Sequence, residues 1–201
     1  MKKASLFLAL LVLCFFVSCI PGVTTKVVTV KNSTGGTLCV DIDSIGQPYK
    51  TKLYAGETKN YIVSRFTPVS KDSFFVYGKN KIIDELDISE GGEFLFTVEA
   101  DRSWIVFKNG SANIIDDAIS VHTEDNKDTL VGLPITAIPE DFIGINGKHD
   151  SLAIGGKLFF PIEKAFGKEA KALYTTIGKK VQHSIKFIIP QPGNQITVEL
   201  K

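Results

Sequence analysis

The sequence predicts an all-β protein made of two tandem, duplicated antiparallel β-sandwich domains. Two observations carry this prediction. The chain resembles itself at an offset of 100 residues, and each half alternates apolar and polar residues with the period of a strand. Turn-forming clusters of Gly, Pro, Asn and Ser separate these segments at intervals of roughly 8–12 residues, a spacing that is typical of sandwiches.

The internal repeat is clearest between residues 56–99 and 156–199. Without a gap, ten of these 44 positions are identical, whereas average composition gives roughly three. The beginnings of the two copies match at a different offset of 77, because "VVTVKN" (27–32) parallels "WIVFKN" (104–109). The difference, 100 − 77 = 23 residues, predicts an insertion in the second copy at about residues 122–150.

Strands are predicted where apolar residues recur at every second position. The residues predicted to point inward in the first and last strands of the two copies are Val28, Val30, Phe94, Phe96 and Val98, then Ile105, Phe107, Ile196, Val198 and Leu200. One short helix is predicted in the second copy, at "IEKAFGKEAKAL" (162–173).

The first 18 residues have the features of a signal peptide. Lys2 and Lys3 form a positive start, and an apolar run over 4–17 is too short to span a bilayer, which takes about 20 residues. The segment Phe16-Val17-Ser18-Cys19 resembles the lipobox of bacterial lipoproteins. The resemblance implies that Cys19 is the lipidated first residue of the mature chain. The alternative is an ordinary secretory signal cut near Ser18.

The predicted organisation follows from the repeat and the signal. It comprises a signal peptide (1–18), a lipidated N-terminus with a short tether (19–26), a first repeat (27–101) and a second repeat (102–201). Acyl chains on Cys19 would bind the lipid bilayer, since each buried CH₂ contributes about 0.8 kcal/mol. By the same resemblance, Ile20 after the cysteine favours the outer membrane of a bacterial envelope, at its periplasmic face or at the cell surface.

Net charge and cysteine content argue against a nucleic-acid partner and against an internal disulfide bond. Removal of Lys2 and Lys3 with the signal changes the formal charge from +1 to −1, so nothing favours a nucleic-acid partner. Once Cys19 is acylated, Cys39 has no thiol to pair with inside the chain. Cys39 is therefore predicted to be a buried or half-buried thiol, and the domains must be stabilised by their cores.

The chain has no recognisable catalytic motif, so we expect neither an enzyme nor a bound cofactor or metal. The sequence holds no Walker loop, no nucleophile elbow and no H-E-x-x-H or C-x-x-C motif. Asp41 and Asp43 have the spacing of one strand face, which leaves an envelope hydrolase as a minor alternative. Two acidic residues on a solvated sheet face are the commoner arrangement.

The predicted insertion gathers charged, histidine and apolar residues. Loops of this length are uncommon and often functional, so it is a candidate contact surface for a partner. An equally good alternative is that it covers an open sandwich edge. The candidate partner-contact residues are Glu124, Asp128, Ile138, Phe142 and His149.

These observations favour a membrane-anchored envelope lipoprotein with a non-enzymatic binding or structural role. Its partner would be another envelope protein or a glycan. The alternative is a surface adhesin or carbohydrate-binding lipoprotein, with Tyr49, Tyr54 and Tyr61 as candidate contact residues. Trp104, the only tryptophan, is expected in core or inter-domain packing, or else as a platform for a ligand.

Overall fold

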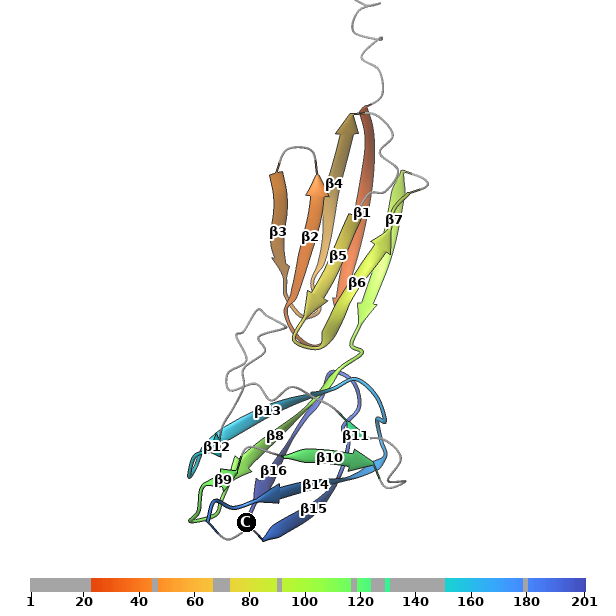
Figure 1. Cartoon of the computed structure of the whole chain (residues 1–201). Coiled ribbons are helices and arrows are strands. Elements are labelled where there is room, and N and C mark those ends of the chain that lie inside the picture. The colour runs from red at the N-terminus through yellow and green to blue at the C-terminus, as the bar shows by residue number, and fades with distance from the viewer. Residues whose placement is uncertain are drawn as a thin grey trace, which may run out of the picture.

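The computed structural model of the chain describes residues 23–44, 47–66, 73–89, 92–116, 119–123, 129–130, 151–178 and 181–201. All of the secondary structure in these ranges is β, and it forms two sandwiches that follow one another along the chain (Figure 1). The predicted all-β class with a duplicated sandwich is confirmed. Among the described residues there is no helix that could cross a membrane.

In the described residues of the first sandwich, seven strands form two sheets. One sheet has the order β4-β1-β7, with β1 (Val23–Ser33), β4 (Thr58–Phe66) and β7 (Glu93–Glu99). The other has the order β3-β2-β5-β6, with β2 (Leu38–Ser44), β3 (Gln47–Leu53), β5 (Ser73–Gly78) and β6 (Lys81–Asp87).

The second sandwich repeats this arrangement. One sheet has the order β13-β8-β16, with β8 (Ser103–Asn109), β13 (Lys157–Ile162) and β16 (Gln195–Leu200). The other has the order β11-β10-β14-β15, with β10 (Ser120–Thr123), β11 (Thr129–Leu130), β14 (Glu169–Thr175) and β15 (Gln182–Ile188). The remaining short pair joins β9 (Ile115–Asp116) to β12 (Ser151–Leu152).

Strand pairing corrects the alignment of the two copies. In the first copy Val28 lies opposite Tyr61 and Phe94, and its equivalent Ile105 lies opposite Phe160 and Ile196. The offset is therefore 160 − 61 = 99 residues for one flanking strand and 196 − 94 = 102 for the other. The gapless offset of 100 is wrong for both, because the loops between the equivalent strands differ in length.

Strand direction differs from the prediction in one respect. The sandwiches are not wholly antiparallel, because β1 pairs with β7 in parallel and β8 pairs with β16 in parallel. Period-two alternation indicates which side chains share a face, but it carries no information on the direction of the neighbouring strand. The two parallel pairs are equivalent, so this feature belongs to the duplicated fold.

The predicted helix over 162–173 is wrong. β13 ends at Ile162, and β14 begins at Glu169 with alternating burial. Between them Ala165 and Gly167 have φ values of 62° and 74°, which a right-handed helix does not accept. The segment "EAKALYT" fits a helix locally, yet Ala170 and its alternate neighbours fill the second core as a strand.

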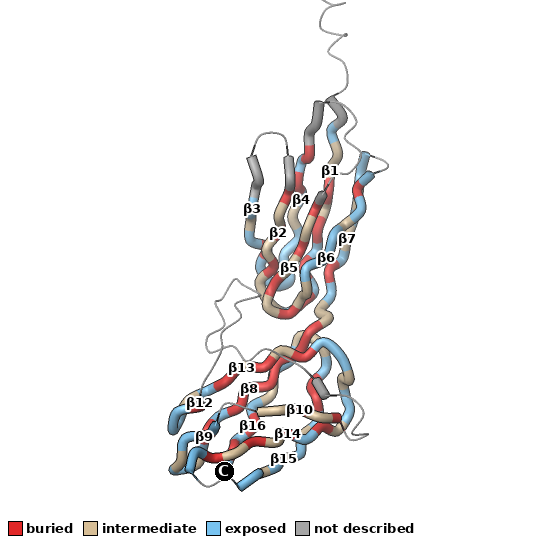
Figure 2. The backbone as a smooth tube through the Cα atoms, in the orientation of Figure 1, coloured by how far each residue is buried: buried red, intermediate tan, exposed pale blue. Residues whose placement is uncertain are grey.

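Each sandwich has its own core between its two sheets (Figure 2). The predicted inward residues Val28, Val30, Ile105 and Phe107 are fully buried. At the closing strands the inward set is confirmed as well, although Phe94, Phe96 and Ile196 are only partly buried. Complete burial of such a side chain stabilises a fold by roughly 1.5–3 kcal/mol, so two separate cores allow each sandwich its own stability.

A buried asparagine lies at or next to the end of the first strand of each sandwich. The Nδ2 of Asn32 donates to the carbonyls of Gly36 and Leu53, at 2.7 and 2.8 Å, and its Oδ1 accepts from the Thr34 amide. Asn109 does the same in the second copy, accepting from the Ser111 amide and donating to nearby carbonyls. The asparagine of the "KN" pair that both copies share therefore stabilises the equivalent turn in each sandwich.

Candidate functional site

The predicted site residues lie outside the described residues. These are Cys19 and the candidate contact residues Glu124, Asp128, Ile138, Phe142 and His149. The lipidation site and the insertion therefore stay predictions. A candidate site has to be built from the described strands and turns.

The tryptophan, tyrosine and cysteine residues that the sequence singled out lie in different environments. Trp104 is 1 % exposed, and its Nε1 donates to the Lys79 carbonyl at 2.9 Å, so it packs between the sandwiches and is not a ligand platform. Tyr61 is buried in the first core, whereas Tyr54 is 61 % exposed in the turn before β4. Only the backbone of Tyr49 is described. Cys39 is partly buried, as predicted.

The described candidates for catalytic groups contact neighbouring side chains. Asp41 forms an ion pair with Lys50 at 3.1 Å, and the side chain of Asp43 is outside the description. His183 stacks on Tyr174 with ring centroids 5.2 Å apart. In the described parts of the chain, no three His, Cys, Asp or Glu side chains lie close enough together to hold a metal ion.

Turns of both sandwiches meet in a polar joint. Asn80, in the β5–β6 turn, donates from Nδ2 to the carbonyls of Thr34 and Gly193, which belong to different sandwiches. Lys79 lies with its Nζ 5.9 Å from the centre of the Trp104 ring and donates to Gln195 Oε1 at 3.2 Å. Burial lowers the pKa of this ammonium group. The joint therefore ties the sandwiches together through side chains as well as through the backbone.

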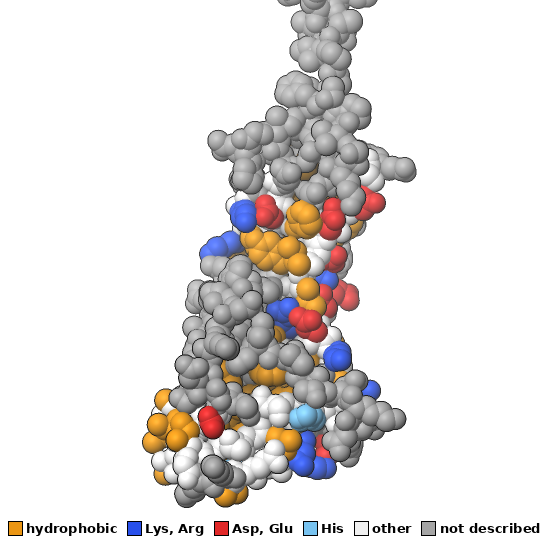
Figure 3. Space-filling view, in the orientation of Figure 1, with side chains coloured by type: hydrophobic (Ala, Val, Ile, Leu, Met, Phe, Trp, Pro, Cys, Tyr) orange, Lys and Arg blue, Asp and Glu red, His pale blue; other side chains and the backbone are white. Residues whose placement is uncertain are grey.

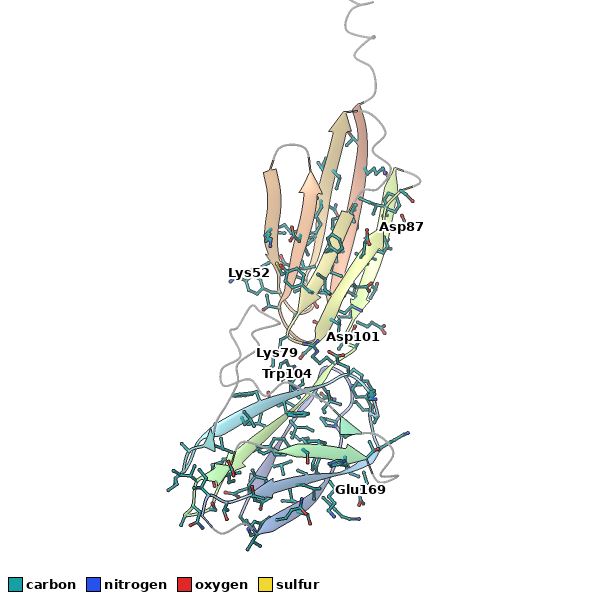
Figure 4. The ribbon with its side chains drawn as sticks, viewed as in Figure 1. Lys52, Lys79, Asp87, Asp101, Trp104 and Glu169 are labelled. Atoms are coloured by element: carbon teal, nitrogen blue, oxygen red, sulfur yellow. The ribbon has the colours of Figure 1, made fainter. Side chains whose placement is uncertain are left out.

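The connecting segment is also held in place. Asp101 accepts hydrogen bonds from Lys81 Nζ and from the Ile82 amide, both at 2.8 Å. Figure 4 shows Lys79, Asp101 and Trp104 together between the two sandwiches. Arg102, 7 % exposed, forms an ion pair with Glu163 at 2.5 Å. A linker fixed at successive residues holds the two sandwiches in a defined relation.

The outer face of the sheet β3-β2-β5-β6 carries the most unusual surface, and we call it the front face. Because Val40, Leu53, Phe74 and Val76 point into the core, their neighbours point outward. The outward residues are Lys50 and Lys52 on β3, Cys39 and Asp41 on β2, Phe75 and Tyr77 on β5, and Ile83, Glu85 and Asp87 on β6.

Strand register arranges these residues in rows across the front face. Lys50 lies opposite Asp41, Asp41 opposite Phe75, and Phe75 opposite Glu85. In the next row, Lys52, Cys39 and Tyr77 lie opposite one another in that order. Each row therefore runs from a lysine at the β3 edge, over an aromatic ring on β5, toward the β6 edge.

Charge is divided across the front face. In Figure 3, Lys and Arg side chains lie on the left of the first sandwich with an acidic side chain beside them, hydrophobic side chains lie in the middle, and most of the acidic side chains lie along the right. Figure 4 likewise shows Lys52 on the β3 side and Asp87 on the β6 side. The aromatic residues Phe75 and Tyr77 are half-buried, and Ile83 is 63 % exposed. The face thus combines an apolar centre with one basic and one acidic edge.

Local contacts tune two groups of the front face. A hydrogen bond to the Asp41 carboxylate raises the pKa of the Lys50 ammonium group. A hydrogen bond with the Cys39 thiol, together with partial burial, raises the pKa of the Tyr77 phenol. At neutral pH, Lys50 is therefore a cation and Tyr77 a neutral hydrogen-bonding group.

The duplicated fold does not require these residues. The equivalent face of the second sandwich carries Glu169, Lys171, Leu173 and Thr175 on β14, and Gln182, Ser184, Lys186 and Ile188 on β15. Among these residues of β14 and β15 there is no aromatic ring, and the acidic Glu169 is paired with Lys186. The front face is therefore a property of the first sandwich alone.

Sequence reasoning missed the front face, although a signal was present. In "SFFVYG" (73–78) two aromatic residues stand at alternating positions beside the core residues Phe74 and Val76. Successive side chains of a strand point to opposite faces of the sheet, so a strand with bulky apolar residues at both odd and even positions places apolar groups on both faces. The charge division depends on four strands and was not visible in any one of them.

Comparison with known proteins yields structural neighbours alone. No protein-family model and no curated protein matches the chain. A mutant of the shaft pilin SpaA from Lactobacillus rhamnosus GG is similar at 8 % identity and a TM-score of 0.32, covering 89 % of this chain and 98 % of the pilin. A candidate adhesin from Bacteroides ovatus is similar at 7 % identity and a TM-score of 0.28, covering 81 % and 77 %.

Proposed function

We propose that this protein is a non-enzymatic lipoprotein of the bacterial envelope, anchored through acylated Cys19, which presents two β-sandwiches for binding or structural organisation. Its binding surfaces would be the front face and the predicted insertion. The resemblance of residues 16–20 to lipoprotein signals favours the outer membrane for this anchor.

One observation carries the proposal: the first strand begins directly after the lipobox-like segment. β1 begins at Val23, four positions after Cys19, and a chain of that length spans at most about 14 Å. β1 starts at the end of the first sandwich that faces away from the second sandwich (Figure 1). An acyl anchor at Cys19 would therefore hold the first sandwich at the bilayer and direct the second sandwich away from it.

The anchor is tested by cell fractionation of the native chain and a Cys19→Ala variant. We expect the native chain in the membrane fraction and the variant in the soluble fraction, since several acyl chains give a stable anchor. Protease treatment of intact cells then distinguishes surface display from a periplasmic orientation. A Cys19→Ala variant that stays in the membrane fraction would contradict the proposal.

A second candidate function is carbohydrate binding, which the aromatic rings of the first sandwich favour. Half-buried Phe75 and Tyr77 stand on one sheet face beside charged groups, and Tyr54 is exposed in the turn before β4. Flat rings and hydrogen-bonding side chains are the groups that recognise sugars. Glycan-array binding that disappears in Phe75→Ala, but not in Leu173→Ala on the second sandwich, would support this function. An array without any signal would dismiss it.

A further inference from the structure

We propose that the front face of the first sandwich binds the front face of a second copy of this chain, in a parallel side-by-side dimer. The parallel direction rests on the proposed anchor, because copies held at Cys19 in one membrane point the same way. A closed pair of identical copies is related by a two-fold axis. For parallel copies this axis runs along the strands, between the two faces.

This symmetry decides which strands meet. Rotation about an axis along the strands brings the β3 edge of one copy over the β6 edge of the other, at the same height along the strands. Lys50 and Glu85 occupy the two ends of one row, so Lys50 of each copy would face Glu85 of the other. At the centre of the interface β2 of one copy would lie over β5 of the other, so each Phe75 ring would face Asp41 and each Tyr77 ring would face Cys39.

Charge complementarity distinguishes this arrangement from the reversed one. In the parallel pair, each basic β3 edge meets an acidic β6 edge, and the contact occurs twice. If the copies ran antiparallel, with the axis across the strands, β3 would face β3 and the lysines would repel one another. The front face is therefore self-complementary only in the direction that a shared membrane imposes.

The second sandwich provides an internal comparison. Its equivalent face carries Lys171 and Lys186 and no acidic residue on β14 or β15 beyond Glu169, which pairs with Lys186. The same fold therefore exists without the division into basic edge, apolar centre and acidic edge. Self-association through the second sandwich is not expected.

The size of the front face predicts a weak contact. Four strands spaced about 4.8 Å apart and about 23 Å long cover a few hundred Å², less than the roughly 800 Å² per partner of a standard interface. Exposed ion pairs contribute about 0–1 kcal/mol each and are screened by salt. We therefore expect pairing on a membrane, where confinement raises the effective concentration, and little pairing in dilute solution.

The test uses the mature lipidated chain in phospholipid vesicles at low salt, as a mixture of ¹⁴N- and ¹⁵N-labelled copies. A zero-length carbodiimide reagent links carboxylates to amines in contact. The expected product is a Lys50–Glu85 link between copies of different label. Within one copy, two strands separate these residues, so this link cannot form there. The Lys50–Asp41 link within each copy, at 3.1 Å, is the positive control.

Charge reversal gives a second, stricter test. Lys50→Glu alone and Glu85→Lys alone each place like charges at both contacts. Because these changes also remove the amine or the carboxylate that the carbodiimide links, dimer yield is measured here by energy transfer between fluorophore-labelled copies on the vesicles, and it should fall at least tenfold. In an equal mixture of the two variants both contacts become attractive again, and yield should return to within about twofold of the native chain. Lys171→Glu, the same change on the second sandwich, should leave the yield unchanged.

Three results would overturn the dimer. They are no Lys50–Glu85 link between copies, single variants that pair as well as the native chain, or a mixture that pairs no better than the single variants. Glycan binding at Phe75 without any dimer would assign the front face to a sugar. Vesicle flotation reports the anchor separately. If the chain does not float, the same cross-linking on the soluble Cys19→Ala chain at high concentration still decides for or against the face.

Discussion

At the scale of single residues, two asparagines repeat one hydrogen-bond pattern. Asn32 and Asn109 are 0 % and 1 % exposed, and each satisfies backbone groups of a turn and of the last residue of a neighbouring strand. Buried polar groups left without a partner cost free energy, and that cost is what keeps the two turns in one conformation.

Asn32→Ala should lower the free energy of unfolding of the first sandwich by about 1–3 kcal/mol. The change removes donors to the Gly36 and Leu53 carbonyls and the acceptor for the Thr34 amide. Urea denaturation measures the loss. Asn60→Ala is the control, because Asn60 is exposed and should change stability by less than about 0.5 kcal/mol. Equal losses in both variants would contradict this role.

The free energy of unfolding should depend on pH through Lys79, which lies in the joint between the sandwiches. Burial lowers its folded pKa below the ordinary value of 10.5, so the unfolded chain holds this proton more tightly. Stability must then rise as pH passes from the lowered folded value toward 10.5. Lys79→Met removes the cost of burying a charge. Any excess of stability of this variant over the native chain at neutral pH should therefore become smaller as the pH rises. Urea denaturation of both proteins measures this difference, and a flat difference would refute it.

At the scale of elements, strand β5 holds both the core and the front face in register. Its pairing with β6 is irregular between Val76 and Gly78. Gly78 lies so close to β2 that an added Cβ would approach the Thr37 carbonyl oxygen to 2.4 Å. The strand therefore needs glycine at this position.

Gly78→Ala should destabilise the first sandwich, by about 1–3 kcal/mol from overpacking against backbone. Gly92→Ala is the matched control, because an added Cβ there meets nothing within 4 Å. That variant should be neutral or slightly more stable. Thermal unfolding compares the two, and tolerance of alanine at position 78 would show that β2 and β5 can separate without cost.

At the scale of the whole molecule, the joint decides whether the sandwiches act as one body. Trp104→Ala removes the hydrogen bond to the Lys79 carbonyl and the ring beside the Lys79 ammonium group. We expect a wider distribution of distances between the sandwiches, measured by small-angle X-ray scattering. Phe160→Ala, which empties part of the second core, should lower stability without this broadening. Identical scattering from Trp104→Ala and the native chain would mean that the backbone alone fixes the joint.

The sequence by itself determined the all-β class, the duplication and most of the inward residues, because alternation and self-similarity are local properties of the chain. The lipobox-like segment around Cys19 is equally local and stays a prediction. Only the tertiary structure decided the parallel pairs, the fate of the segment 162–173 and the joint at Trp104. The front face also depended on the tertiary structure. Its charge division arises from the order of four strands in the sheet, and this order cannot be predicted from how far apart the strands are in the sequence.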